Sequence, residues 1–254
     1  MRDTIWNVDV QGASLHDILD AIDGDIAQGK MRRTLFCANP HSLVVAERDG
    51  EFLSALRAAD YLIPDGAGIV LASRILRGGI MERVTGSDIL RGVAGRWDAH
   101  GAKSFFFLGS TAAVLERVKE RMAREYPRVA VAGVYSPSFG DALTKEENAA
   151  IVEKIQRAAP TALWVGMTAP KQEKWIRANL SALPVPFIAA IGAAFDYFAG
   201  TKQRASESFQ RAGLEWLPRL LREPGRMWRR NFVSTPLFLY HVMLQRLGSL
   251  PARS

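Results

Sequence analysis

In Leu163-Trp164-Val165-Gly166-Met167-Thr168-Ala169-Pro170-Lys171-Gln172-Glu173-Lys174-Trp175, an apolar strand, a short loop and a helix are predicted to follow one another directly. Gly166 ends the strand, and Pro170 suits the first helical turn, where a backbone N–H has no partner within the helix. The N-terminus of such a helix directs backbone N–H groups toward the carboxyl end of the strand, where a phosphate is favoured. Lys171 and Gln172 would add side-chain donors at that place.

The same order of strand and helix recurs along the first 200 residues. Short apolar or β-branched runs that end in turn residues predict strands at 34–38, 61–64, 104–108, 129–134, 162–165 and 187–191. Helical patterns cover residues 111–126 and 145–158, and Thr144-Lys145-Glu146-Glu147 has the spacing of a capping box. At the start of the chain, residues 5–9 predict a strand and residues 15–26 a helix. This alternation predicts a Rossmann-like α/β domain over residues 1–200, with a mainly parallel sheet and helices on both faces.

The net charge of +7 is unevenly distributed along the chain. Residues 1–200 contain 23 Lys and Arg against 23 Asp and Glu, whereas residues 201–254 contain 10 against 3. In that second part, Trp and Leu are interleaved with the basic residues Arg219, Arg222, Arg226, Arg229 and Arg230. We therefore predict a basic, helical C-terminal appendage over residues 201–254. Its arginines suit anionic lipid as well as nucleic acid, and its leucines favour a membrane surface.

The composition also bears on the compartment. A single cysteine, Cys37, excludes an internal disulfide framework, and residues 1–4 lack the apolar core of a signal peptide. The longest apolar stretch, residues 236–244, is far shorter than the roughly 18 residues that a membrane-spanning helix needs. We therefore expect a cytoplasmic protein that does not cross the bilayer.

Asp65 is the strongest candidate for a catalytic base. It follows the strand-like Tyr61-Leu62-Ile63-Pro64 and precedes Gly66. Asp65 thus lies at the carboxyl end of a strand, which is where parallel α/β sheets bind ligands. A turn or a helix cap explains Pro-Asp-Gly equally well, so both interpretations stay open. Asn39, at the end of another strand, and Arg83, between two helical segments, could meet Asp65 at one edge of the sheet. Together they could orient a hydroxyl, remove its proton and neutralise a leaving phosphate.

Other polar and small residues at strand ends are candidates for binding a substrate. Gly109 and Ser110 precede a helix, and their small size would let the backbone approach an anion, although Ser110 could simply cap that helix. Asp196 follows a strand and could receive a donor from a ribose or base, or act as a cap or loop residue. For Lys171 and Glu173, the alternative is a solvated first helical turn.

We expect neither a bound metal nor a cofactor. Asp23-Gly24-Asp25 resembles the paired aspartates that hold a divalent ion in many nucleotide-sugar transferases. The apolar residues of the same segment, however, place both aspartates on the polar face of a surface helix. The four histidines are scattered without the spacing of metal ligands.

Taken together, these blocks resemble the WecG/TagA/CpsF glycosyltransferase family over about residues 5–235. The resemblance lies in Asn39-Pro40-His41-Ser42-Leu43, Pro64-Asp65-Gly66, Arg83-Val84-Thr85-Gly86, Leu108-Gly109-Ser110, Val165-Gly166-Met167, Pro170-Lys171-Gln172-Glu173, Gly192-Ala193-Ala194-Phe195-Asp196, Gly213-Leu214-Glu215-Trp216-Leu217, Arg219-Leu220 and Glu223-Pro224. Two positions depart from the family pattern: Cys37 stands where relatives often have threonine, and Ala205-Ser206 replaces alanine-proline. The first departure bears on a contact with the acceptor.

The resemblance implies an inverting enzyme of cell-surface or exopolysaccharide biosynthesis. It would move a sugar from a nucleotide donor, usually UDP-linked, to a polyprenyl-diphosphate-linked sugar on the inner face of the cell membrane, without a metal. Asp65 would be the general base, Asn39 would support the acceptor or the base, and Arg83 and Gln172 would lie near the diphosphate or the sugar. The nucleotide pocket would include Gly109, Ser110, Gly166 and Asp196.

The resemblance also implies that the basic appendage holds the enzyme on the membrane and helps to complete the active site. Its arginines would then meet lipid phosphates or the acceptor diphosphate. An alternative from another class is a nucleic-acid-binding protein that uses this appendage and has no transferase activity. The sequence leaves the oligomeric state open, a homo-oligomer included, as well as the donor sugar and the acceptor glycan.

Overall fold

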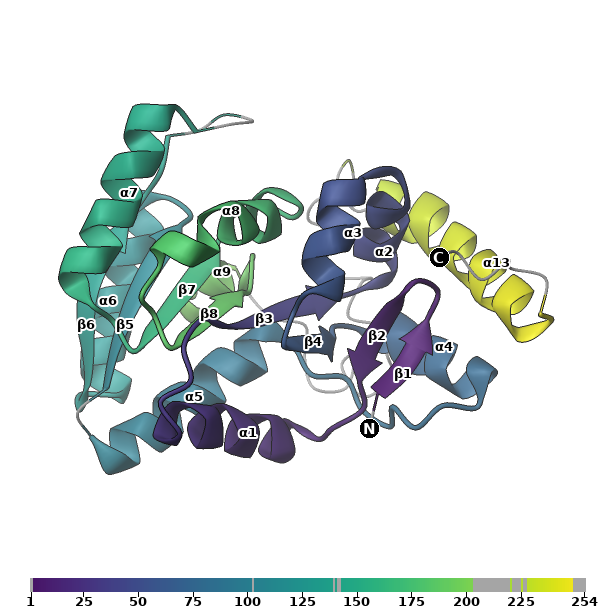
Figure 1. The fold of residues 1–254 in the computed structure, drawn as a ribbon, viewed down its shortest axis with the longest axis horizontal. Helices are drawn as coiled ribbons and strands as arrows, with labels where there is room; N and C mark the ends of the chain where they lie inside the picture. Colours follow the sequence, from purple (N-terminus) through teal and green to yellow (C-terminus); the bar gives the residue numbers. More distant parts are fainter. Residues whose placement is uncertain are drawn as a thin grey trace.

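The computed structural model describes residues 2–101, 103–138, 140, 143–202, 220, 225 and 228–248, and a six-stranded parallel sheet forms its centre (Figure 1). The strands are β3 (Arg33–Ala38), β4 (Tyr61–Pro64), β5 (Lys103–Gly109), β6 (Val129–Tyr135), β7 (Ala162–Gly166) and β8 (Phe187–Ala190). Their order is β4-β3-β8-β7-β5-β6, and every pair of neighbours is parallel. The predicted α/β class is confirmed.

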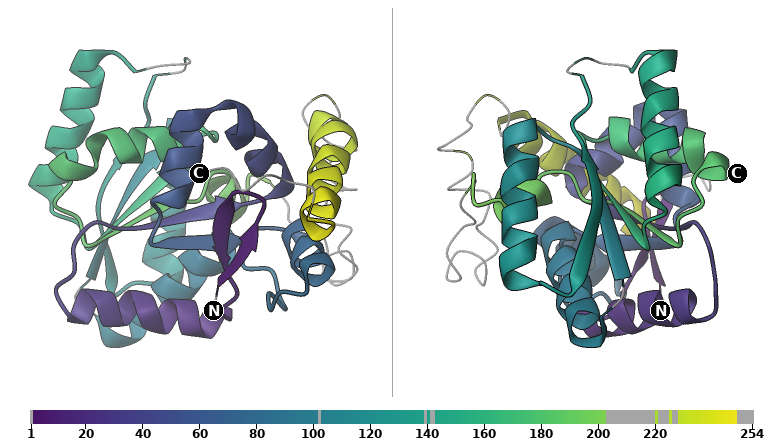
Figure 2. Two further views of the ribbon diagram at one scale, coloured as in Figure 1. Left: turned by 45° about the vertical axis from the view of Figure 1, so that its right-hand side comes forward. Right: turned by 90° about the vertical axis from the view of Figure 1, so that its left-hand side faces the viewer.

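Helices cover both faces of this sheet, as the sequence predicted. One face packs against α2 (Pro40–Arg48), α3 (Gly50–Arg57), α7 (Lys145–Ala158) and α8 (Lys171–Asn179). The other packs against α1 (Leu15–Ala27), α5 (Gly86–His100), α6 (Ala112–Glu125) and α9 (Ala194–Phe198). Figure 2 shows α6 and α7 on opposite sides of the sheet. The short 3-10 helix η1 (Leu180–Ala182) follows α8.

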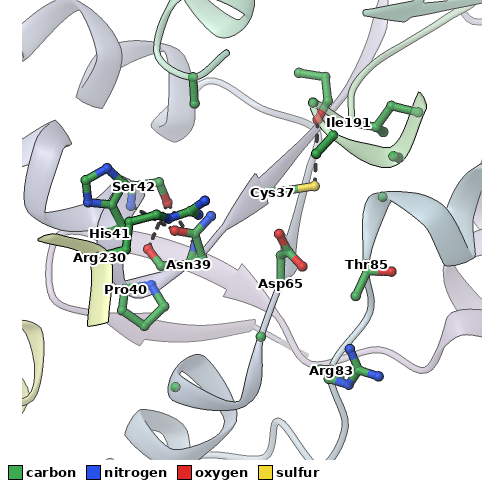
Figure 3. A pocket seen from close by; sticks show the side chains of 18 of the residues that line it. Cys37, Asn39, Pro40, His41, Ser42, Asp65, Arg83, Thr85, Ile191 and Arg230 are labelled. Carbon is green, nitrogen blue, oxygen red and sulfur yellow. Dashed lines mark hydrogen bonds between the residues drawn. The ribbon is translucent and has the colours of Figure 1, made fainter. Parts of the chain in front are cut away.

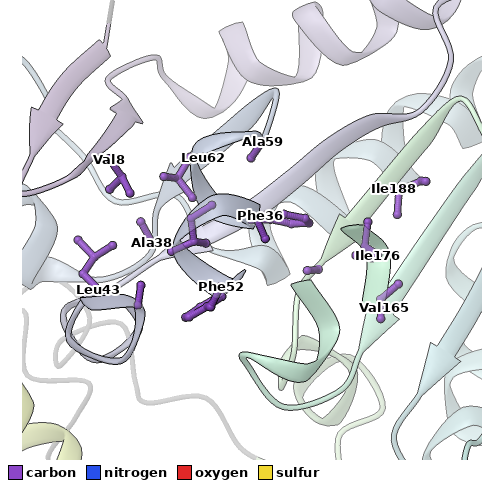
Figure 4. Packing of buried hydrophobic residues seen from close by; sticks show 14 of the residues in the cluster. Val8, Phe36, Ala38, Leu43, Phe52, Ala59, Leu62, Val165, Ile176 and Ile188 are labelled. Carbon is purple, nitrogen blue, oxygen red and sulfur yellow. The ribbon is translucent and has the colours of Figure 1, made fainter. Parts of the chain in front are cut away.

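Apart from the partly exposed edge strand β6, the strands are mainly apolar because both of their faces are buried. In β5, Phe105 and Phe107 enter one core, and Phe106 and Leu108 enter the other. Figure 4 shows part of the first core, where Phe36 of β3 lies among side chains from α3, α8 and the neighbouring strands. Each large apolar side chain buried in this way stabilises the fold by roughly 1.5–3 kcal/mol.

The N-terminal segment differs from the prediction of a single strand over residues 5–9. It forms an antiparallel hairpin of β1 (Arg2–Ile5) and β2 (Val8–Gln11), separate from the main sheet. Trp6 and Asn7 make the two-residue turn, and Trp6 adopts a left-handed φ of 58°. Hairpin turns of this length commonly require a positive φ, but a tryptophan rarely supplies it, so residues 6 and 7 were not recognisable as a turn.

Helix α13 (Thr235–Arg246) packs against this hairpin and against α2. His41 of α2 and Ser234, just before α13, are joined by a 2.8 Å hydrogen bond between Nδ1 and Oγ. Trp6 stacks on His241 with ring centroids 4.2 Å apart, and its backbone N–H donates to Gln245 Oε1 at 2.7 Å. Phe238 and Val242 are buried in the same core as α2 and α4 (Ala67–Leu76). The end of the described chain is therefore packed onto the α/β domain.

The predicted division at residue 200 falls beside segments outside the described residues. Arg219, Arg222 and Arg226 lie there too, as does Ala205-Ser206, whereas Arg229 and Arg230 begin the π-helix η2 (Arg229–Ser234). Of the helices that the structure describes, none has the length and apolar character needed to span a bilayer.

The expectation for Asp25 is wrong, because this residue is buried rather than exposed on the polar face of α1. Its carboxylate is 2.7 Å from Lys30 Nζ and 2.7 Å from Arg33 Nε, and it accepts a 2.6 Å hydrogen bond from the Tyr61 hydroxyl. Burial alone would raise the pKa of Asp25, but these three donors outweigh it and hold the pKa at about 2. The polar face of α1 thus packs against the starts of β3 and β4.

Candidate active site

The carboxyl ends of five strands open onto one cavity of about 1340 Å³. The connections after β3, β4, β5, β7 and β8 all contribute to its wall, as do the N-terminal turns of α2, α4 and α8 and the N-cap of α6. The neighbouring strands β3 and β8 lead to helices on opposite faces of the sheet, which makes their boundary a topological switch point. Open α/β sheets bind ligands in this position.

The structure brings Asn39, Asp65 and Arg83 to this cavity, from three separate connections. Figure 3 shows their side chains, with Asp65 between the other two in that view. Backbone hydrogen bonds hold the connections together: the N–H of Asp65 donates to Ala38 O at 2.8 Å, and that of Val84 to Pro64 O at 3.0 Å. Residues distant in sequence therefore share one wall because β3 and β4 are neighbours.

Asp65 is not the N-cap residue of α4. That position is taken by Gly66, whose φ of 116° suits glycine. Asn39, in contrast, does cap: its Oδ1 accepts from the Ser42 N–H at 3.0 Å, and Ser42 Oγ accepts from the Asn39 N–H at 2.8 Å. Asn39 is thus fixed at the cavity wall by its own helix.

Cys37 also lines the cavity, from the second-last position of β3, two residues before Asn39. The thiol is buried and directed at Ala190 O of β8, with 3.7 Å between Sγ and the oxygen. Burial raises the pKa of this thiol, and the nearby carboxylates of Asp65 and Glu173 raise it further. At this position the chain presents a small neutral group to the cavity.

On the opposite wall lie four of the predicted binding residues, Ser110, Gly166, Gln172 and Asp196. Gly109 is buried behind them: a Cβ there would stand 2.6 Å from the backbone of Gly166, and its φ is 123°. A Cβ on Gly166 would stand 2.6 Å from the ring of Phe195. Both glycines are therefore required where β5, β7 and α9 approach closely.

The structure also separates capping from the candidate binding residues on this wall. Thr111, not Ser110, caps α6 by accepting from the Val114 N–H at 3.2 Å. The N-cap of α9 is Ala193, so Asp196 does not cap that helix. Lys171 lies off the cavity wall, and its Nζ donates to Gly140 O at 2.8 Å.

Glu173 was not predicted as a site residue, and its expected exposure was wrong. Glu173 is 1% exposed and Gln172 4% exposed, and both line the cavity. Gln172 Nε2 donates to Glu173 Oε1 at 2.8 Å. The apolar Trp175 and Ile176, one turn further along α8, were the signal that this face of the helix is buried.

The C-terminal segment reaches the same cavity. Arg229, Arg230 and Phe232 line it beside His41 of α2. Burial lowers the pKa of His41, and the charge of Arg230 lowers it further. Two of the five predicted tail arginines thus lie where they can contribute to the wall.

Within the described ranges, no group of three or more His, Cys, Asp or Glu side chains is arranged so that it could bind a metal ion. Asp23 and Asp25 do not line the cavity. Asp23 instead accepts a 2.7 Å hydrogen bond from Trp97 Nε1.

The sequence model of the Glycosyl transferase WecG/TagA/CpsF family matches residues 4–251. The chain belongs to this family. It is a glycosyltransferase, and this result favours the enzyme over a protein that only binds nucleic acid.

Several curated proteins are similar to this chain over most of their own length. Each of them is named N-acetylglucosaminyldiphosphoundecaprenol N-acetyl-beta-D-mannosaminyltransferase. The protein of Bacillus subtilis strain 168 is 27% identical over 241 residues, covering 95% of this chain and 91% of the relative. That of Bacillus spizizenii is 30% identical over 212 residues, with 84% and 79% covered. That of Staphylococcus aureus strain MW2 is 27% identical over 239 residues, with 94% and 91% covered.

Proposed function

We propose that this glycosyltransferase inverts the anomeric centre of a UDP-linked sugar while transferring it to a sugar carried on polyprenyl diphosphate. The relatives' names support an N-acetylhexosamine donor, N-acetylmannosamine in the first instance, and an N-acetylglucosaminyl-diphospholipid acceptor. Cell-surface or exopolysaccharide biosynthesis is the proposed context. The observation that carries the proposal is the convergence of Asn39, Asp65 and Arg83 on one cavity.

In the proposed mechanism, Asp65 is the general base. The acceptor hydroxyl attacks the anomeric carbon, a new C–O bond forms, and the bond from that carbon to the diphosphate oxygen breaks. The hydroxyl proton passes to the Asp65 carboxylate, and UDP leaves with the bonding electrons. A single base is sufficient for such a displacement, and proton transfer of this kind contributes roughly 10²–10⁴-fold to a rate.

The leaving diphosphate is stabilised by fixed positive charge and partial charge around the cavity. Arg83 lies on the Asp65 side, and Arg229 and Arg230 approach from the C-terminal segment. The N-cap of α6 and the first turn of α8, helices of 14 and 9 residues, line the cavity on the side of β5 and β7. Helix N-termini favour anions, so we assign the donor diphosphate to that side, with Ser110, Gly166, Gln172 and Asp196 around the nucleotide and sugar.

We further propose that residues 1–200 form the catalytic domain and that residues 201–254 attach it to the inner face of the cell membrane. The described part of the appendage has exposed apolar side chains, Trp228, Phe232 and Val233, next to the exposed Arg229. Leu71 and Met81 are also exposed and lie at the cavity. Apolar and basic side chains together suit an interface with anionic lipid, from which a polyprenyl-linked acceptor could enter.

The proposal is tested with purified protein, UDP-N-acetylmannosamine and a short-chain polyprenyl-diphosphate N-acetylglucosamine in detergent. We expect release of UDP that depends on the acceptor and continues in the presence of EDTA. Liposomes that contain anionic lipid should co-sediment with the full chain. Absence of transfer to any polyprenyl-diphosphate-linked sugar, across a panel of UDP-sugars, would contradict the proposed function.

A further inference from the structure

Glu173 is a deeply buried polar residue on the cavity wall to which the proposed mechanism gives no task, and it is paired with Gln172. Their side chains come from the first turn of α8 and are joined by the 2.8 Å hydrogen bond from Nε2 to Oε1. Among the described residues, neither Gln172 Oε1 nor Glu173 Oε2 has a hydrogen-bond partner. Two buried polar atoms without hydrogen-bond partners lower the stability of the fold. A native protein that keeps such atoms has a reason to keep them, such as a role in the site.

The surroundings of Glu173 disfavour a negative charge. Within the described part of the chain, no lysine, arginine or histidine forms an ion pair with it. The neighbouring Lys174 is instead paired with Asp49 and Glu51 of α3, at 2.8 Å and 3.1 Å. Burial raises the pKa of Glu173 to about 7, although the hydrogen bond from Gln172 lowers it in part.

The other titratable groups near this carboxyl do not compensate for a charge. From β3 comes the Cys37 thiol, whose pKa is raised by burial and then by Asp65 and Glu173. Asp65, after β4, and Asp196 of α9 line the same cavity. A charge on Glu173 would add to the negative charge of this cavity and would repel an anionic ligand.

We propose that Glu173 is a positioning residue that acts as an uncharged carboxylic acid, holding the Gln172 amide at the cavity wall and keeping negative charge away from the donor diphosphate. This inference rests on the proposed function. As an acid it still accepts from Gln172 Nε2 through Oε1, so the amide keeps one orientation. In this orientation the Gln172 amide lies beside Gly192, in the connection after β8. A Cβ built on Gly192 would be 3.7 Å from Gln172 Nε2 and 3.8 Å from its Oε1.

The consequence is a donor affinity that depends on the protonation of Glu173. Below the pKa of Glu173 this carboxyl adds no negative charge to the wall beside the helix N-termini and the basic groups. Above it, one negative charge is fixed close to the diphosphate in a poorly hydrated site. We expect the Kd of the donor to increase by roughly threefold to tenfold as a result.

The test measures the Kd of UDP-N-acetylmannosamine by calorimetry between about pH 5.5 and about pH 8.5, a range in which its diphosphate diester stays fully ionised. Glu173→Gln keeps an acceptor for Gln172 and cannot ionise. Glu173→Ala removes the acceptor. Glu146→Gln is the matched control, because Glu146 also lies in the first turn of a helix, α7, but is exposed and away from the cavity.

For the wild type and Glu146→Gln we expect the Kd to increase across this range. Glu173→Gln should retain the low-pH affinity throughout, and Glu173→Ala should bind several-fold more weakly at every pH. Equal pH dependence in the wild type and Glu173→Gln would overturn the inference while leaving the proposed function intact, since the donor would still bind. A wild type that binds no UDP-sugar at any pH would contradict both.

Discussion

The two edges of the parallel sheet use the same kinds of side chain in opposite ways. At the amino edge, Asp25 is enclosed by Lys30, Arg33 and Tyr61, and Asp60 accepts from the Thr34 N–H at 2.7 Å. At the carboxyl edge, Asp65 and Glu173 line a large cavity instead. Carboxylates at the first edge are surrounded by donors from the protein, and those at the second border a space that a ligand can fill.

This difference separates stability from function in physical terms. A buried carboxylate with several donors has a lowered pKa and stabilises the folded state at neutral pH. A buried carboxyl without a cation has a raised pKa and destabilises the folded state at neutral pH. Proteins retain such a carboxyl where a functional site requires it. Substitutions at the two edges should therefore affect different measurements.

The largest expected effect is that of Asp65→Asn at the carboxyl edge. Loss of the base should reduce kcat by about 10³-fold, while the Kd for the UDP-sugar changes by no more than about threefold. The measurements are steady-state transfer and donor calorimetry on the same preparation.

Asp196→Asn is the matched control on the opposite wall of the cavity. We expect it to weaken donor binding and to leave kcat at saturating donor close to the wild-type value. Near wild-type transfer by Asp65→Asn, or an equal loss of kcat in both variants, would remove Asp65 from the role of base.

The next effect concerns the stability of Glu173→Gln as a function of pH. The folded-state pKa of about 7 is above the ordinary value of 4.5, so the folded protein binds this proton more tightly than the unfolded chain. The contribution of Glu173 is therefore fully present below about pH 4.5 and is lost as the pH rises through about 7. Denaturant unfolding should show the wild type losing about 3 kcal/mol over this window relative to Glu173→Gln. Parallel curves for the two proteins would show that folding does not raise the pKa of Glu173.

A smaller effect of opposite sign is expected for Asp25→Asn at the amino edge. The pKa of Asp25 is lowered from 3.8 to about 2, so its stabilisation is present above pH 3.8 and is lost as the pH falls through about 2. At neutral pH the variant should lose about 2 kcal/mol of unfolding free energy, and kcat of the folded enzyme should be unchanged. A change in kcat of Asp25→Asn without a change in its unfolding free energy would contradict the proposed difference between the two edges of the sheet.

The sequence predicted those parts of the fold that depend on local pattern. The strands at 34–38, 61–64 and 104–108 were recognisable because both faces of a parallel sheet are buried, which makes each strand continuously apolar. Asn39, Asp65 and Arg83 were recognisable because they follow strand ends or connect helices. Thr144 was recognised as an N-cap, and its Oγ1 accepts from the Glu147 N–H at 3.1 Å.

The remaining features depend on contacts between distant segments. The carboxylate of Glu147 binds Ser138 instead of completing the capping box at Thr144. Asp25 is buried because the starts of β3 and β4 supply its partners, and no spacing within α1 indicates that. The Trp6 turn and the burial of Glu173 likewise depend on tertiary packing, against α13 and within the cavity wall respectively.

The configuration of the new glycosidic bond tests the central claim most directly. If Asp65 serves as the only base for a direct displacement, NMR of the product should show an anomeric configuration opposite to that of the sugar in the UDP donor. A product with the donor's configuration would require a second displacement through an enzyme-bound intermediate and would contradict the account.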